Sequence, residues 1–408
     1  MDYRRLLSAK GRIMKSFVRI AVLGVAIAAP ALGWPQGAQP ESKDEGLKLG
    51  IFDVTGYVDL SANHLSRSNL FISRAPSRVF DLEKSGAAVR QVAVTLANQP
   101  KEGFGGLLNV IVGKDPDLVA AYKTDPNNGK GCNVATGLNA DGTSCDRDRF
   151  DVTQAFLQYA SGPFLVTAGK YVTYAGAEVI QSTANPNFSR SILFGYAIPF
   201  THTGVRAYYD VTDTFQLMGG VNQGWDDIKD TNSSKGYELG FNFTPTKALS
   251  IHPMIHGGKE RVGGLVNTGP EGNRDLFDLV VIFNATDKLT FILNYDRGTQ
   301  ANTAGAVPSG ASKAVWSGWA GYANYQFTDE WKLSFRAEDF DDQDGYRTGI
   351  VQKWKEATLT LAWLPTKPIE LRGEVRRDRS NVASFLDRDN VTGRNTNTSY
   401  GLQFLYKF

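Results

Sequence analysis

Apolar and polar residues alternate with a period of two along most of this chain. The last segment places five aromatic or aliphatic residues on one parity: Tyr400, Leu402, Phe404, Tyr406 and Phe408. The same alternation recurs in four earlier segments: 237–243, 289–296, 331–338 and 369–376. Successive side chains of a β-strand point to opposite faces, so each segment predicts a strand with one apolar and one polar face. Segments 88–97 and 164–171 fit either parity, which predicts β-bulges there.

Short turns and long loops separate these segments in strict alternation. The long loops are eight in number: 66–87, 115–148, 174–201, 225–234, 260–272, 297–313, 341–353 and 379–396. With seven short turns they divide residues 49–408 into sixteen strands. An even number of antiparallel strands of about 10–12 residues suits a transmembrane β-barrel. The predicted fold is therefore all-β, a 16-stranded antiparallel barrel with short periplasmic turns and long external loops.

Aromatic residues gather beside the short turns. They include Tyr159, Phe164, Tyr209, Phe215, Phe243, Phe327, Trp331, Trp363 and Phe408. Aromatic rings at strand ends form the interfacial girdle of a membrane barrel. The strands of a soluble β-sandwich show the same alternation of apolar and polar residues. Such a fold does not require aromatic residues at one end of each hairpin. The pattern favours the membrane barrel, and no later segment approaches the 18 apolar residues of a transmembrane helix.

The N-terminus has the three parts of an export signal. A basic region extends to Arg19, ten apolar residues run from Ile20 to Ala29, and small residues follow to Gly33. We interpret residues 1–33 as a signal peptide, with Met14 as an alternative start. A membrane anchor is the other interpretation, but ten apolar residues are too few to cross a bilayer. Residues 34–48 are then a short periplasmic segment before the barrel at 49–408.

Composition and motifs exclude several other functions. The formal net charge of +2 becomes slightly negative without the basic leader, which argues against a nucleic-acid binder. Neither a haem-attachment motif nor a glycine-rich phosphate loop is present, so no cofactor is predicted. His64 and Ser66 would suit a histidine–serine hydrolase, but such pairs arise often by chance. His252 and His256 lie about 13 Å apart on a strand, too far to bind one metal. No catalytic residues or metal ligands are predicted, and the chain is expected not to be an enzyme.

Cys132 and Cys145 lie in one loop of an exported chain, which predicts a disulfide. Closing a loop of this size contributes about 3 kcal/mol in the chain-entropy model. Two thiols without a nearby histidine do not complete a zinc site. The surrounding Asp, Asn and Gly residues lack the spacing of a calcium loop, and turn formation explains them equally well.

Charged residues recur on the polar parity that would face the lumen. The predicted pore-lining set is Asp53, Asp59, Arg206, Asp210, Glu238, Lys332, Arg336, Glu338, Glu370, Arg372, Glu374 and Arg376. Facing acidic and basic walls would orient polar solutes in a transverse field. Alternatively these side chains only hydrate the wall and pair across strands. The sequence does not decide between these two interpretations. Glu178 and Arg190 in the third long loop are the candidates for setting charge selectivity.

The leader, the sixteen alternating strands and the terminal Leu405-Tyr406-Lys407-Phe408 resemble a Gram-negative general porin. Segments 175–180, 185–194 and 199–206 resemble the family called putative beta-barrel porin-2. The resemblance implies that loop 174–201 folds into the lumen and narrows it; an external cap is the alternative. It also implies that the barrel assembly machinery reads Phe408, and it permits a homotrimer.

The sequence therefore predicts a porin in the outer membrane of a Gram-negative bacterium, surrounded by outer-membrane lipid and lipopolysaccharide. Small hydrophilic solutes and ions would diffuse through its water-filled lumen. One alternative is a channel selective for a sugar, phosphate or carboxylates, with Tyr57, Tyr208, Trp316 and Tyr322 as candidates for an aromatic slide. Another is a non-conducting barrel that acts as an adhesin or structural protein.

Overall fold

The computed structural model describes residues 47–69, 78–81, 85–121, 150–230, 232–262, 269–387 and 391–408. The predicted signal peptide, most of the segment 34–48 and the predicted Cys132–Cys145 disulfide lie outside these residues and stay predictions. No described helix is long and apolar enough to cross a bilayer.

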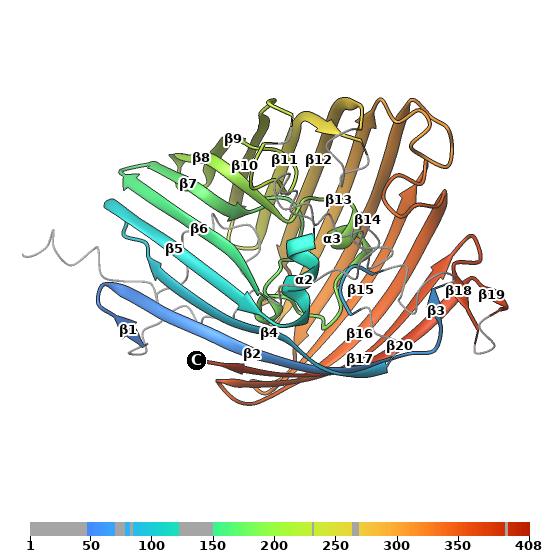
Figure 1. The fold of residues 1–408 in the computed structure, drawn as a ribbon. Helices are drawn as coiled ribbons and strands as arrows, with labels where there is room; N and C mark the ends of the chain where they lie inside the picture. The colour runs from blue at the N-terminus through green and yellow to red at the C-terminus, as the bar shows by residue number, and fades with distance from the viewer. Residues whose placement is uncertain are drawn as a thin grey trace, which may run out of the picture.

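Sixteen antiparallel strands form a closed barrel, which confirms the predicted fold (Figure 1). The strands are β2 (Phe52–Leu65), β4 (Ser85–Asn98), β5 (Gly103–Val112), β6 (Phe150–Ser161), β7 (Phe164–Val172), β8 (Thr201–Thr212), β9 (Phe215–Asn222), β10 (Gly236–Thr246), β11 (Leu249–Arg261), β12 (Glu271–Asn284), β13 (Leu289–Ala301), β14 (Lys313–Gln326), β15 (Trp331–Asp342), β16 (Gln352–Thr366), β17 (Ile369–Ser380) and β20 (Thr396–Lys407). Each pairs with its sequence neighbour, and β20 pairs with β2 to close the ring.

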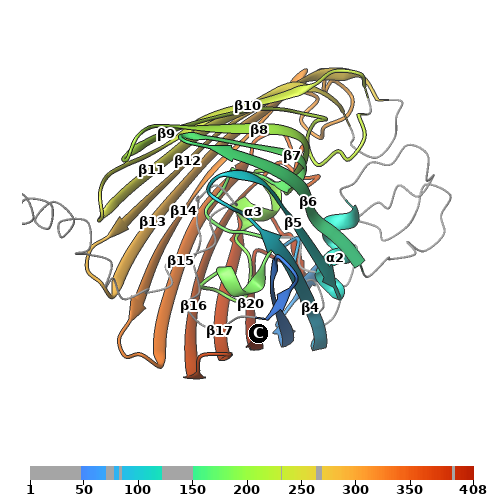
Figure 2. The same ribbon diagram turned by 90° about the vertical axis from the view of Figure 1, so that its left-hand side faces the viewer.

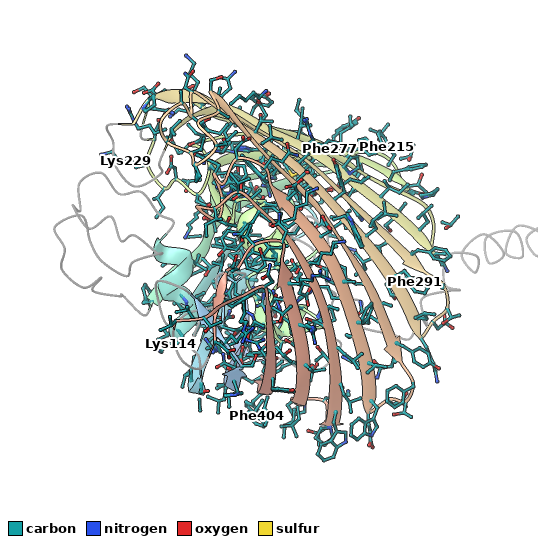
Figure 3. The ribbon with its side chains drawn as sticks, turned by 90° about the vertical axis from the view of Figure 1, so that its right-hand side faces the viewer. Lys114, Phe215, Lys229, Phe277, Phe291 and Phe404 are labelled. Atoms are coloured by element: carbon teal, nitrogen blue, oxygen red, sulfur yellow. The ribbon has the colours of Figure 1, made fainter. Side chains whose placement is uncertain are left out.

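The period of two divides every wall strand between lumen and lipid. In β16, Thr358 and Thr360 are buried inward while Leu359 and Leu361 are exposed outward. The outward apolar side chains form a continuous belt, and in Figure 3 Phe277 and Phe291 project from the outer surface of the sheet. An apolar belt around the outside of a closed barrel is typical of a wall that faces lipid.

One predicted bulge is present and the other is not. In β4, Asp59 pairs with Gln91 and Leu60 with Val89, so Arg90 is the extra residue and both Arg90 and Gln91 point inward. β7 pairs with both neighbours without a register shift, so the bulge predicted there is wrong. A second bulge lies instead in β6, between Val152 and Gln154.

Aromatic rings cluster at the short-turn end. Trp331 and Trp363 stack with centroids 6.0 Å apart, and Phe215 contacts Phe241 and Phe243 across the β9–β10 pair. These rings lie where the girdle was predicted, at one edge of the apolar belt.

Shorter elements join the loops to each other and to the wall. β1 (Lys48–Leu49) pairs with β2, while β3 (Ser68–Asn69), β18 (Phe385–Leu386) and β19 (Gly393–Arg394) form a small separate sheet between the first and last long loops. Among the described residues, three short helices lie between wall strands: α2 (Lys114–Ala121), η1 (Ser182–Ala184) and α3 (Ile192–Tyr196). Figure 2 shows α3 within the ring of strands, and α2 contacts β4 and β6.

Candidate functional site

The segment between β7 and β8, residues 173–200, lies inside the barrel; we call it the inserted loop. Most of its residues are buried, including Ile180, Ile192, Leu193, Phe194 and Phe200. These apolar side chains join inward residues of the wall in one hydrophobic cluster. The loop has the composition of a buried segment because it is surrounded by barrel wall rather than by solvent.

Backbone N–H groups of the inserted loop donate to wall carboxylates. Glu374 accepts from the N–H groups of Phe188 and Ser189 at 2.8 and 3.1 Å. Glu338 accepts from Ile192 and Leu193, the first residues of α3, at 2.8 and 3.1 Å. Backbone groups with no secondary-structure partner are thus satisfied by the wall.

Wall arginines donate to the carbonyl groups of the same loop. Arg336 Nη1 donates to the Ser189 carbonyl at 2.7 Å, and Arg376 Nη1 to the Arg190 carbonyl at 2.6 Å. Arg372 Nη1 reaches the Ser182 carbonyl at 3.3 Å. The alternating charges of β15 and β17 therefore hold the backbone of the loop in place.

The same charges form a buried ion network behind the loop. Arg336 pairs with Glu178 at 2.7 Å and with Glu356 at 3.0 Å, and Arg376 pairs with Asp378 at 2.7 Å. All five side chains have at most 1% of their surface exposed. Removing one partner of such a network costs about 3–5 kcal/mol because a buried charge is left unpaired.

Glu178 and Arg190, the candidates for charge selectivity, both lie in the inserted loop and are buried. Glu178 pairs with Arg336 and also accepts from the Ser191 N–H at 2.7 Å. Arg190 folds back on its own loop, donating to the carbonyls of Val179 and Ile180 at 3.0 and 2.8 Å. Both charges are therefore engaged in holding the fold of the loop.

Other predicted pore-lining residues lie at two depths. Arg206 and Glu238 form a buried pair at 2.6 Å in the wall beside the start of the inserted loop. Asp59, also buried, accepts from Gln403 at 2.8 Å. Glu370 contacts Arg372 at 2.8 Å and Lys407 at 2.9 Å near the short-turn end.

The more accessible members of the set lie toward the short turns. Asp53 is exposed and 3.5 Å from Lys48, and Asp210 is exposed and accepts from Gln216 at 2.7 Å. Lys332 is half-buried on the inward parity of β15. These three residues place charges that solutes can reach at this mouth.

Glycines in the wall accommodate apolar side chains of the loop. A Cβ at Gly401 of β20 would lie 2.4 Å from the ring of Phe188, and one at Gly318 of β14 would lie 2.6 Å from Leu193. Absence of a side chain at these two inward positions lets the loop approach the backbone of the wall.

Other long loops also contact the inserted loop, which the sequence did not indicate. Phe80 packs between Phe194 and Phe200, with centroids 5.8 Å from each. Asp226, whose φ of 63° lies in the left-handed region that aspartate tolerates, accepts from Phe200 and Thr201 at 2.6 and 3.0 Å. Burial raises the pKa of the Asp226 carboxyl to about 7, although these two N–H groups favour its charged form.

The second long loop contributes a similar contact. Asp115 of α2 accepts from Gln91 of β4 at 2.8 Å, and Gln91 also donates to the Ile180 carbonyl of the inserted loop. Burial raises the pKa of Asp115 to about 7. A lone aspartate in a polar loop carries no sequence signal of such a role.

The structure does not form the histidine–serine pair, a metal site or an exposed aromatic slide from the described histidines and aromatic residues. His64 Nδ1 lies 2.6 Å from Ser85 Oγ, while Ser66 donates to Asn397, so His64 and Ser66 do not pair. No group of three His, Cys, Asp or Glu side chains in the described part of the chain has metal-binding geometry. The four candidates for an aromatic slide are all buried: Tyr57, Tyr208, Trp316 and Tyr322.

The family model described as "Putative beta-barrel porin-2, OmpL-like" matches residues 52–408. No similar sequence was found among curated proteins.

Several solved outer-membrane proteins share the fold. The channel DcaP of Acinetobacter baumannii has a TM-score of 0.57 at 14% identity, over 89% of this chain and 99% of that one. OmpT of Vibrio cholerae, folded in vitro and solved in a trimer form, has a TM-score of 0.52 at 11% identity, over 88% and 99% of the chains. An anion-selective porin from Comamonas acidovorans has a TM-score of 0.55 at 11% identity, also over 88% and 99%.

Proposed function

This chain belongs to the putative beta-barrel porin-2, OmpL-like family and is an outer-membrane porin, and we propose that it admits small hydrophilic solutes and ions by passive diffusion past the inserted loop. The loop crosses the lumen and sets the size of the solutes that pass.

One observation carries this proposal: the charged ladder of β15 and β17 binds the backbone of the inserted loop. Glu338 and Glu374 accept its N–H groups, and Arg336 and Arg376 donate to its carbonyls. Because these charges are buried and paired, they offer little field to a passing solute. Size, rather than charge at the narrowest point, is then the main criterion for passage.

Charge selectivity of the proposed pore would arise at the short-turn mouth. Asp53, Asp210 and Lys332 are the predicted lining residues with accessible side chains there, and their signs are mixed. We expect weak selectivity between anions and cations. The four candidates for an aromatic slide are buried, so they do not support a path for sugars. No single observation therefore favours a channel specific for one solute.

Single-channel conductance of the refolded protein in a planar bilayer tests the proposal. We expect small, ohmic steps with weak ion selectivity, and exclusion of solutes larger than small sugars. Absence of conductance from a barrel shown to be folded by its heat-modifiable mobility would contradict it and support the non-conducting alternative.

We propose a homotrimer, supported by the trimer form of the structurally similar OmpT. Native mass spectrometry in non-ionic detergent tests this, and a monomer at all concentrations would contradict it. The terminal Phe408 exchanges two backbone hydrogen bonds with Gly56, at 2.8 and 2.9 Å, next to the closing seam. The position of Phe408 supports the proposal that the barrel assembly machinery recognises this residue when the barrel closes.

The chain is proposed to be a channel rather than an enzyme, and to reach a Gram-negative outer membrane through a cleaved leader. N-terminal sequencing of the protein from isolated outer membranes tests the cleavage near residue 33. Lipid hydrolysis by the purified barrel would contradict the assignment as a channel alone.

A further inference from the structure

Four basic side chains form a patch on the outside of the barrel, which we call the outer basic patch: Lys353, Lys355, Arg377 and Arg379. They alternate with buried residues of β16 and β17, so they point away from the lumen. In β17 the outward series runs from Leu371 and Val375 to Arg377 and Arg379 toward the long-loop end. The patch therefore begins where the apolar belt ends.

Register places these side chains in a compact group. Lys355 lies directly opposite Arg379, and Arg377 opposite Ala357. On the other side, Arg377 and Arg379 face Thr398 and Thr396 of β20. Paired strands lie about 5 Å apart, so Lys355, Arg379 and the threonine hydroxyls are close enough to contact one small group.

The charges of the patch are only partly neutralised. Lys353 lies 3.0 Å from Asp341, and Lys355 3.7 Å from Asp339. The side chains of Arg377 and Arg379 are exposed, and their guanidinium groups have no hydrogen bond or ion pair to any described residue. Elsewhere on β17 the inward arginines, Arg372 and Arg376, are fully engaged. Two free guanidinium groups thus stand at the margin of the lipid.

The depth of an arginine side chain in the bilayer determines which groups its guanidinium can contact. An arginine on the lipid face costs about 2–4 kcal/mol at the bilayer centre and about 0–1 kcal/mol near the interface. At the interface the available anions are lipid headgroups, and guanidinium groups bind phosphate oxygens in a bidentate geometry. A free solute phosphate would not need a site that continues the apolar belt.

We propose that the outer basic patch binds the phosphate group of a phosphorylated lipid in the surrounding leaflet, with its acyl chains along Val375 and Leu359. Arg377 and Arg379 supply the main contacts, while Lys355 and the threonine hydroxyls complete them. The proposal uses the outer-membrane location of the proposed function but does not depend on conduction.

Native mass spectrometry of the refolded barrel with diphosphorylated lipid A tests this proposal. The variant is R377Q/R379Q, and the matched control is K259Q/R297Q, which removes two exposed outward cations from β11 and β13. We expect at least tenfold weaker lipid binding by R377Q/R379Q, unchanged binding by the control, and no competition by millimolar inorganic phosphate.

Equal loss of lipid binding in both variants, unchanged binding by R377Q/R379Q, or equal affinity for dephosphorylated lipid A would overturn the proposal. Competition by inorganic phosphate would also overturn it in favour of a solute site. Both variants change exposed side chains, and heat-modifiable mobility verifies that each is folded. Conductance is measured separately, so loss of lipid binding with normal conductance leaves the proposed function intact.

Discussion

Glu178 of the inserted loop and Arg336 of β15 form a fully buried ion pair, with 2.7 Å between Oε1 and Nη1. They are 158 residues apart in sequence and join the loop to the opposite wall of the barrel. Arg336 also donates to the Ser189 carbonyl, so one side chain holds both a charge and the backbone of the loop. This pair makes the position of the loop depend on the wall charges.

Replacement of Arg336 is expected to release the loop. R336M leaves Glu178, Glu338 and Glu356 without their shared cation, so the free energy of unfolding should fall by about 3–5 kcal/mol. We also expect a larger single-channel conductance. The control K353Q removes an exposed pair with Asp341, and exposed pairs of this kind contribute little to stability. Equal urea midpoints and conductances for the two variants would contradict this role.

A side chain at Gly401 should displace the inserted loop without changing any charge. The Cβ of G401V overlaps the ring of Phe188 at 2.4 Å, so Phe188 must leave its place against β20. We expect increased conductance and an increased size limit for solutes. In the control G373A the new Cβ lies 3.9 Å from Leu402 on the same pair of strands. Unchanged conductance in folded G401V would show that Phe188 does not position the loop.

Asp226 should make stability depend on pH. Its folded pKa of about 7 lies above the value of about 3.9 in an unfolded chain, so the folded state binds more protons between these values. Stability contributed by this group is therefore highest below pH 4 and falls as the pH rises to 7. D226N retains an acceptor for Phe200 and Thr201 without the charge.

We expect D226N to be more stable than the parent protein at pH 8 and to differ little from it at pH 4, measured by thermal unfolding. Asp230 provides a control of opposite sign: although partial burial opposes it, hydrogen bonds from Lys235 and two backbone N–H groups lower its pKa. D230N should lose stability at pH 8. The assignment fails if D226N and D230N respond to pH in the same direction.

Lys332 tests where charge selectivity arises. It is half-buried on the inward face near the short-turn mouth, and K332E changes the local charge by two. We expect the reversal potential in a salt gradient to shift toward cation preference. K259E makes the same change on the outer wall of β11 and should leave the reversal potential unchanged. Equal shifts would indicate a surface potential rather than a lumenal effect.

The sequence predicted the barrel well because the period of two is imposed by the membrane itself. Where the environment changes, the pattern also changes: β13 continues to Ala301, past the predicted boundary at 297, and still pairs with β14. The outward residues Arg297 and Thr299 of this extension are polar, as expected where a strand has left the lipid. The end of the apolar pattern therefore marks the edge of the membrane rather than the end of the strand.

The site was only partly predictable for a different reason. The parity of β15 and β17 placed Arg336, Glu338, Glu374 and Arg376 inward, but parity carries no information about what an inward side chain contacts. Their partners are backbone groups of the inserted loop, which no residue pattern reveals. Asp226 and Phe80 were missed because their contacts arise only when separate loops meet inside the barrel.

We propose above all that the inserted loop limits the passage of solutes through the lumen. Single-channel conductance of a variant in which residues 178–195 are replaced by a short glycine linker tests it most directly, alongside the parent protein. We expect a severalfold larger conductance and entry of larger sugars, from a barrel that remains heat-modifiable. The same conductance and the same size limit in both folded proteins would contradict it.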